Sequence, residues 1–165
     1  ATEEMLRIAR VVRPHSVGLV PERRQELTTE GGLDAAGHQK RLKPLVEKIR
    51  SKGIQVSLFI DPVPAQVEAA RFIGVEAVEL HTGAYAGAAS ADAQHDELKK
   101  VQFAAARARE LKLVLNAGHG LNYGNVEPIA RLPGVHELNI GFSIIARALF
   151  VGLEPAVREM KKKIY

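Results

Sequence analysis

The sequence contains no cysteine and no tryptophan. Without cysteine, the chain can form no disulfide, no Cys-ligated zinc or iron–sulfur site and no thiol nucleophile. Aromatic residues make up only 5% of the chain, and its one dense basic run is Lys161–Lys163. Nucleic-acid binding usually combines a basic surface with aromatic side chains on which bases stack. We therefore expect no nucleic-acid partner.

Long apolar runs are also absent. No stretch approaches the roughly 18 apolar residues of a membrane-spanning helix. The segment Ala1–Met5 lacks the basic stretch and apolar core of a signal peptide. The 165 residues are 46% hydrophobic and 25% charged, which is typical of a globular domain. We expect one domain, residues 1–165, located in the cytoplasm and without membrane contact.

Short β-branched runs alternate with longer segments that have apolar residues at helical spacing. The five expected strands are 17–20, 54–60, 75–80, 113–115 and 135–140. One intervening segment carries Leu98, Val101, Ala105 and Ala108 on one helical face. A last helix is expected at about 154–163. This alternation predicts an α/β fold with a parallel sheet.

Four residues mark expected helix ends. Asp34 and Asp92 precede two of the helical segments, where an N-cap residue is expected. Gly53 and Gly74 stand where a helix should end and a strand begin.

Polar and glycine-rich segments follow the strands. Asp61 comes after the second expected strand, 81–83 after the third, 116–120 after the fourth, and Gly141 ends the fifth. Such residues at the carboxyl end of many strands are typical of a TIM (β/α)8 barrel, whereas a doubly wound sheet gathers them at one switch point. The GxGxxG and GxxxxGK[ST] patterns do not occur, so dinucleotide binding and Walker-type phosphate binding are not supported.

The last two loops suggest phosphate binding. Gly118, Gly120 and Gly141 let the backbone approach an anion, and an expected helix begins directly after Gly141. Barrels commonly bind phosphate between the loops after strands seven and eight. The five strands would then be strands four to eight of a barrel whose first three strands are missing. A complete barrel has roughly 250 residues, so we expect a partial TIM barrel.

Six motifs occur in order along nearly the whole chain: Leu19–Glu26, Thr28–Asp34, Gln55–Asp61, Glu79–Gly83, Asn116–Leu121 and His136–Gly141. Together they resemble the pyridoxine 5'-phosphate synthase family of vitamin B6 biosynthesis, whose members are TIM barrels. The resemblance implies condensation of 1-deoxy-D-xylulose 5-phosphate with 3-amino-2-oxopropyl phosphate. The products are pyridoxine 5'-phosphate, inorganic phosphate and water. It also implies acid–base catalysis without metal or organic cofactor, in a homo-oligomer.

The resemblance assigns catalytic roles to two residues. His119 matches the proton donor of the family, and an imidazole suits this role because it titrates near neutrality. Glu79 matches a carboxylate that stabilises the transition state. From the sequence alone, Glu79 is a charged residue in an apolar run, and a structural ion pair with a neighbouring strand is the alternative.

Substrate contacts are implied for four residues. Thr28 matches a position that binds the deoxyxylulose phosphate, although a turn or N-cap role is equally open from the sequence. Gly120, Gly141 and Phe142 match positions that bind the aminooxopropyl phosphate. Phe142 departs from the family pattern, because many relatives carry histidine there. Polar residues that follow the first strand are candidates for loop closure or subunit contact: Glu22, Arg23, Arg24 and Glu30.

Two alternatives stay open. In the family, a base glutamate, a histidine and several substrate-binding residues precede the part that this chain matches. The chain could therefore be a catalytically incomplete fragment that only binds phosphorylated ligand. It could also be another phosphosugar enzyme of the same barrel type, which would turn over one substrate alone.

Overall fold

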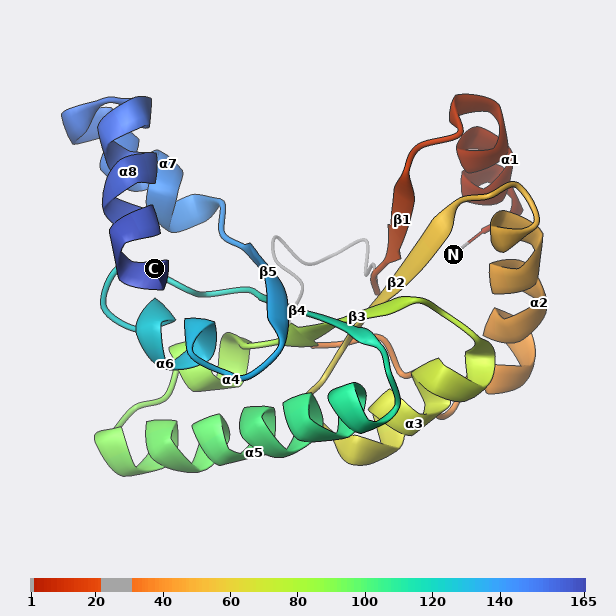
Figure 1. The fold of residues 1–165 in the computed structure, drawn as a ribbon, viewed down its shortest axis with the longest axis horizontal. Helices are drawn as coiled ribbons and strands as arrows, with labels where there is room; N and C mark the ends of the chain where they lie inside the picture. The colour runs from red at the N-terminus through yellow and green to blue at the C-terminus, as the bar shows by residue number, and fades with distance from the viewer. Residues whose placement is uncertain (1, 22–30) are drawn as a thin grey trace.

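The computed structural model describes residues 2–21 and 31–165. Five parallel strands form one sheet in which neighbours in the chain are neighbours in space (Figure 1). The strands are β1 (Ser16–Leu19), β2 (Gln55–Ile60), β3 (Ala77–His81), β4 (Val114–Gly118) and β5 (Val135–Asn139). All five expected strands are present, with ends shifted by a few residues.

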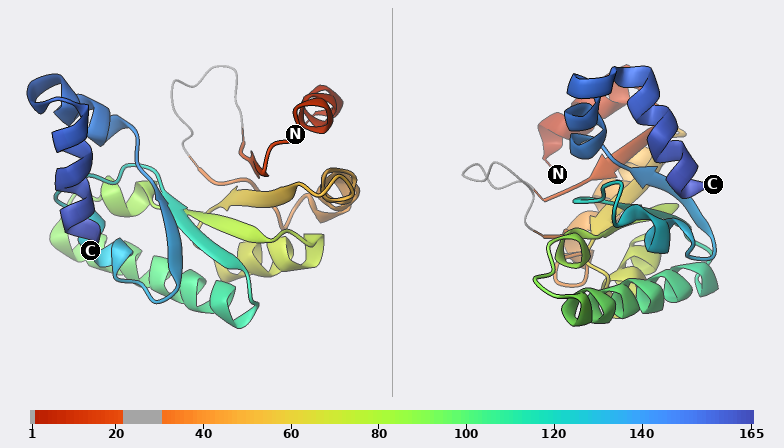
Figure 2. Two further views of the ribbon diagram at one scale, coloured as in Figure 1. Left: turned by 45° about the horizontal axis from the view of Figure 1, so that its top comes forward. Right: turned by 90° about the vertical axis from the view of Figure 1, so that its left-hand side faces the viewer.

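Helices follow or precede the strands as the alternating pattern predicts. They are α1 (Glu3–Val12), α2 (Gln39–Arg50), α3 (Pro64–Ile73), α4 (Gly83–Ala86), α5 (Ala91–Glu110), α6 (Val126–Ala130), α7 (Phe142–Val151) and α8 (Leu153–Ile164). Helices α2, α3 and α5 cover one face of the curved sheet, whereas α1 at one end and α7 with α8 at the other rise as two arms (Figures 1 and 2). The last helix confirms the segment expected at about 154–163.

The core lies between the sheet and the helices on its outer face. Because side chains alternate along a strand, Val56, Leu58 and Ile60 of β2 share one face, and all three are fully buried. They belong to the same apolar cluster as Leu42 and Val46 of α2. Each such buried side chain contributes about 1.5–3 kcal/mol.

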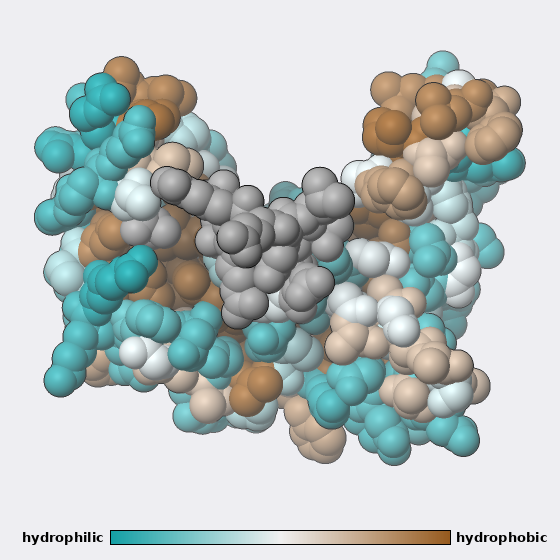
Figure 3. Space-filling model, turned by 180° about the vertical axis from the view of Figure 1, so that it is seen from behind, coloured by the Kyte–Doolittle hydropathy of each residue, from teal (hydrophilic) through white to brown (hydrophobic). Residues whose placement is uncertain are grey.

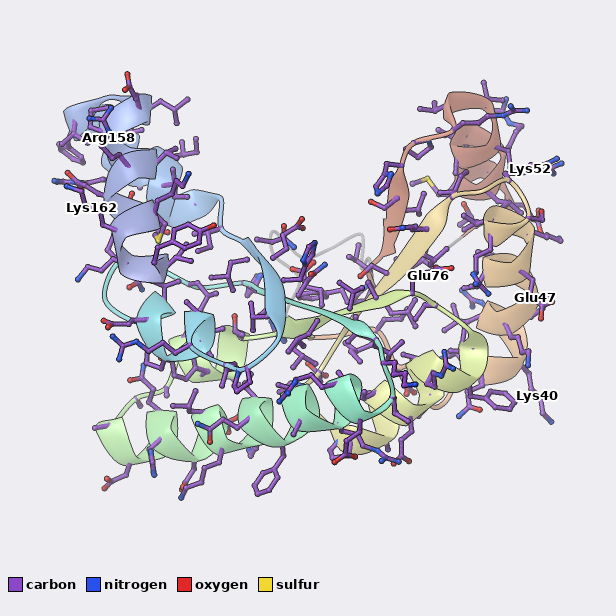
Figure 4. The ribbon with its side chains drawn as sticks, in the orientation of Figure 1. Lys40, Glu47, Lys52, Glu76, Arg158 and Lys162 are labelled. Atoms are coloured by element: carbon purple, nitrogen blue, oxygen red, sulfur yellow. The ribbon has the colours of Figure 1, made fainter. Side chains whose placement is uncertain are left out.

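The opposite sides of the helices carry charge. Figure 4 shows Lys40 and Glu47 on the outer side of α2, and Arg158 and Lys162 on the outer side of α8. All four are exposed. The charged and apolar faces of these helices therefore fix which side packs on the rest of the molecule.

The expected helix ends are only partly right. Gly74 does end α3, with a left-handed φ of 92°. Gly53 also has a positive φ, but it lies in the turn after α2, which ends at Arg50. The N-cap predictions for Asp34 and Asp92 are wrong. The N-cap of α5 is Ser90, whereas Asp34 accepts a hydrogen bond from Gly37 N in a turn before α2 begins.

The sheet is open at both edges within the described ranges. There, β1 pairs only with β2, and β5 pairs only with β4. Helix α7 exposes apolar side chains, including Phe142, Leu149 and Phe150, and Figure 3 shows such side chains gathered on both arms. The described residues therefore form an open, curved βα sheet and not a closed barrel.

Candidate functional site

The inner face of the sheet, which the helices do not cover, carries polar side chains. The strand register places Glu79 of β3 between Phe59 of β2 and Asn116 of β4, and Glu137 of β5 beside Asn116. Alternation along β3 puts Glu79 and His81 on this face and the buried Val78 and Leu80 on the other. Buried polar residues facing a concave surface indicate a ligand site more than a packing surface.

A pocket of about 910 Å³ opens at the carboxyl ends of β3, β4 and β5. It brings together five of the six candidate residues of the sequence analysis: Glu79, His119, Gly120, Gly141 and Phe142. Its further lining residues are Val20, Phe59, Leu121, Asn122, Asn139, Ile140, Ser143 and Ala146. The sixth candidate, Thr28, lies outside the described residues, as do Glu22, Arg23, Arg24 and Glu30.

Glu79 is a partly buried carboxylate in the wall of this pocket. Burial raises its pKa above the ordinary value; a hydrogen bond with Asn139 acts in the opposite direction, and the nearby charge of Glu137 adds to the rise. A side chain at Gly118 would overlap Glu79 Oε1 and crowd Asn139, so the carboxylate would have to move from its present position. No lysine or arginine lies within salt-bridge distance of Glu79 in the part of the chain that is described. The described residues therefore offer Glu79 no cation for a structural ion pair.

His119 follows β4 in a backbone conformation that few residues adopt. Its φ is 86°, which is uncommon for a residue with a side chain and is usually found where the surrounding structure enforces it. Thr82 supplies that constraint. Its hydroxyl Oγ1 lies 2.7 Å from the carbonyl oxygen of Gly118 and 2.6 Å from that of His119, and its backbone N donates to Gly118 O at 2.8 Å.

Replacing Thr82 by valine tests this constraint. Thr82 is fully buried, and valine has its shape but leaves both carbonyl oxygens without the hydroxyl. We expect Thr82→Val to lower the free energy of unfolding by about 1–2 kcal/mol, as measured by urea denaturation. Ser51→Ala is the control, because it removes an exposed hydroxyl that also donates to a carbonyl oxygen. Equal stability of the two variants would contradict the role of Thr82.

The ring of His119 lies against two other rings. Its centroid is 4.9 Å from that of His81 and 6.5 Å from that of Phe59. Burial lowers the pKa of His119, and the positive charge that His81 can carry lowers it further. His81 in turn contacts Asp61, with Nδ1 3.1 Å from Oδ1. In the sequence, Asp61 and His81 directly follow two adjacent expected strands, but no motif there indicated a role for them.

The remaining candidates surround the first turn of α7. Gly141 is the residue before this helix, with open space around the position of a Cβ, and Phe142 begins it with 90% of its side chain exposed. Gly120 has a φ of 72°, and a side chain there would collide with Ala86. The free N–H groups of a helix N-terminus attract anions. The pocket thus combines an acid, an imidazole and an anion-attracting helix end.

Within residues 2–21 and 31–165, no group of three or more His, Asp or Glu side chains could hold a metal ion. None of the helices described there is long and apolar enough to cross a membrane.

Comparisons with known proteins show which family the chain matches over its whole length. The model of the family "Pyridoxal phosphate biosynthesis protein PdxJ" matches residues 1–165. A pyridoxine 5'-phosphate synthase of Synechococcus sp. (strain JA-2-3B'a(2-13)) is 57% identical over 162 residues, which are 98% of this chain and 68% of that protein. The enzyme of the same name from Parasynechococcus marenigrum (strain WH8102) is 56% identical over 164 residues, covering 99% and 66%. The chain thus spans about two thirds of the length of these relatives.

Among solved structures, the tryptophan synthase A-subunit from Pyrococcus furiosus is similar, with a TM-score of 0.57 and 16% identity. The match covers 99% of this chain and 59% of that one. At this identity the similarity concerns the fold alone. With the five parallel strands in consecutive order, it confirms the predicted α/β class and the predicted part of a TIM-type barrel.

Proposed function

Because the chain belongs to the family of the pyridoxal phosphate biosynthesis protein PdxJ, we propose that it acts in pyridoxine 5'-phosphate synthesis as one partial barrel domain. The substrates are 1-deoxy-D-xylulose 5-phosphate and 3-amino-2-oxopropyl phosphate. The observation that carries the proposal is that Glu79, His119 and the N-terminus of α7 line one pocket. The cytoplasmic location expected from the sequence is part of this proposal.

We propose the following chemistry. The amine of one substrate condenses with the ketone of the other to form a Schiff base and release water. Loss of inorganic phosphate and ring closure with further loss of water then give the pyridine ring. These steps require groups that move protons and stabilise charge, and none of them needs a bound cofactor.

His119 is proposed to protonate a leaving group. Its ring reaches the pocket from a loop that Thr82 fixes, so its direction is set before substrate arrives. Burial, which lowers its pKa, favours release of the proton once the imidazolium has formed.

Glu79 is proposed to stabilise positive charge that develops on the substrate nitrogen. The burial that raises its pKa also removes water that would screen the carboxylate. A carboxylate in such surroundings attracts an iminium-like cation more strongly than an exposed one does.

Phosphate is proposed to bind at Gly120, Gly141 and the first turn of α7. The contact through Gly141 and Phe142 would use backbone N–H groups, because a phenylalanine side chain offers no hydrogen bond. Thr28 stays a proposed contact for the deoxyxylulose phosphate.

Replacing Phe142 by histidine tests the place of the phosphate. We expect Phe142→His to bind inorganic phosphate about threefold more tightly at about pH 6, where an exposed imidazole is charged, and equally at about pH 8. Isothermal titration calorimetry at the two pH values measures this. Phe150→His, at the exposed far end of the same helix, should change neither affinity. The same gain in both variants would contradict a phosphate site at the start of α7.

The function itself is tested with the purified chain and both substrates. Pyridoxine 5'-phosphate detected by mass spectrometry, with one phosphate released per product, is the expected result. Binding of 3-amino-2-oxopropyl phosphate in calorimetry without product would instead select the ligand-binding fragment, an alternative favoured by the two open sheet edges. Turnover of one substrate alone would indicate another phosphosugar enzyme. Absence of both binding and product would refute the proposal.

The family resemblance also leads us to propose a homo-oligomer. Light scattering coupled to size-exclusion chromatography measures the mass in solution. A mass equal to the 18.0 kDa of one chain would overturn this part of the proposal.

A further inference from the structure

We propose that Asp61 and His81 are a positioning pair for His119, in which Asp61 fixes the proton of His81 on Nδ1 and a charge on His81 weakens the binding of a proton to His119. The proposal rests on the proton-donor role of His119 in the proposed function. His81 lies on β3, Asp61 directly follows β2, and His119 directly follows β4. Three consecutive strands thus deliver the three groups to one end of the sheet.

Asp61 and His81 are held together by a specific contact. Asp61 Oδ1 lies 3.1 Å from His81 Nδ1 and also accepts a hydrogen bond from Gly32 N at 2.8 Å. A carboxylate can only accept, so the proton between the two side chains belongs to Nδ1 of the neutral imidazole. The bond from Gly32 holds the carboxylate in place. The tautomer and the ring direction of His81 are therefore set by Asp61.

The other ring nitrogen of His81, Nε2, has no partner within residues 2–21 and 31–165. His81 is 7% exposed, and its Nε2 is buried without a hydrogen bond among the described residues. A buried polar atom without a partner is rare and calls for an explanation. The ring of His81 packs edge-on against Phe59, with 5.1 Å between the centroids, and this packing does not require a nitrogen at the Nε2 position.

Because Gly83 has no side chain, it leaves a space between His81 Nε2 and the ring of His119. A Cβ added at Gly83 would lie 2.5 Å from His81 Nε2 and 3.0 Å from His119 Cδ2. The two rings therefore adjoin one small space that a side chain at Gly83 would fill. The separation of 4.9 Å between their centroids agrees with this.

The charge on one ring consequently affects the other. A positive charge on His81 repels a proton on His119, because the two ring centroids are only 4.9 Å apart. Among the described residues, the pocket that His119 lines contains one other ionisable side chain, Glu79 of β3. Helix α4 contributes Tyr85, whose hydroxyl donates to Asn125 O. The first turn of α7 contributes no charge, since it begins with Phe142 and Ser143. His81 is thus the one cation-forming side chain placed against the proton donor in the described part of the site.

Histidine NMR on the isotope-labelled chain tests the proposal without any substrate. We expect His81→Gln to raise the proton affinity of His119 by about fourfold, the Coulomb repulsion of two unit charges about 5 Å apart in water. His38→Gln is the matched control. His38 also lies beside an aspartate, Asp34, but is exposed and away from the pocket, so the titration of His119 should stay unchanged. A His81→Gln chain that is less stable but titrates His119 as before would show a purely structural role and overturn the proposal.

The same spectra test the part played by Asp61. In the unsubstituted chain, the ¹⁵N shifts of neutral His81 should show the proton on Nδ1. Asp61→Ala should move it toward Nε2, whereas Asp61→Asn should retain it on Nδ1, because the amide oxygen still accepts from both Nδ1 and Gly32 N. If Asp61→Ala fails to fold, the ¹⁵N shifts of His81 in the unsubstituted chain are the test. A proton on Nε2 of His81 in that chain would overturn the proposal. Failure of synthesis with these results intact would refute the proposed function alone.

Discussion

Replacing His119 by asparagine is expected to slow the formation of pyridoxine 5'-phosphate by about 10²- to 10⁴-fold, the usual contribution of a positioned general acid. Asparagine is the suitable substitute because it tolerates a positive φ better than most residues, and His119 has a φ of 86°. It keeps a polar side chain in the pocket but has no proton to transfer near neutrality. The loss should therefore fall on the rate of turnover.

Rates and binding should separate in this experiment. Product formation followed by mass spectrometry gives the rate, and calorimetry gives the affinity for 3-amino-2-oxopropyl phosphate. The affinity is expected to change little, because the phosphate is assigned to backbone groups at Gly120 and α7. His15→Asn, at an exposed position outside the pocket, should retain full activity. A His119→Asn chain that turns over at the original rate would remove His119 from the mechanism.

The pH dependence of the unsubstituted chain follows from the same assignment. The donor is the protonated imidazole, and burial with the neighbouring His81 lowers the pKa of His119. Activity that depends on this proton is therefore expected to fall as the pH rises, beginning at a lower pH than for a free histidine. His119→Asn should remove this fall from the residual activity.

Much of the fold could be predicted from the sequence because its signals are local. The strand after Gly53 is a run of β-branched and large apolar residues, and a left-handed glycine ends α3 where Gly74 predicted it. Asp34 shows where such reasoning fails. Its carboxylate accepts from Gly37 N and from the amide of Gln66, which lies 32 residues away. A contact with α3, invisible in the local pattern, holds Asp34 in a turn ahead of α2.

Some features of the site could be predicted from the sequence in the same way, and others could not. Residues that follow neighbouring parallel strands must meet at one end of the sheet, so the sequence predicted that Gly120 and Gly141 would lie close together. The Asp61–His81 contact depends on ring direction and on which nitrogen faces the carboxylate. The clamp on the His119 loop likewise depends on the rotamer of Thr82. Neither side-chain geometry is encoded in spacing along the chain.

Replacing Glu79 by glutamine is expected to change activity and stability in opposite directions. Glutamine has nearly the shape of the carboxylate but no charge with which to stabilise a cation, so turnover should fall by about 10²- to 10³-fold. Stability should instead rise by about 1 kcal/mol at about pH 7, as it commonly does when an active-site group that is unfavourable to folding is removed.

The pH dependence of that gain distinguishes the two interpretations of Glu79 that the sequence left open. Burial raises the pKa of Glu79 in the folded chain, so folding disfavours the ionised carboxylate. The free energy of unfolding of the chain therefore falls as the pH rises through that pKa. Glu79→Gln removes this loss, and the difference should vanish below about pH 4, where the carboxyl is protonated in both states. Urea denaturation across this range measures it, with Glu47→Gln on the outer side of α2 as the control without effect. Had Glu79 been half of a structural ion pair, its pKa would be lowered and the glutamine variant would be less stable near neutrality. A loss of stability at about pH 7 would therefore return Glu79 to a structural role, whereas a gain paired with lost turnover marks a charge kept in the pocket for its effect on the substrate.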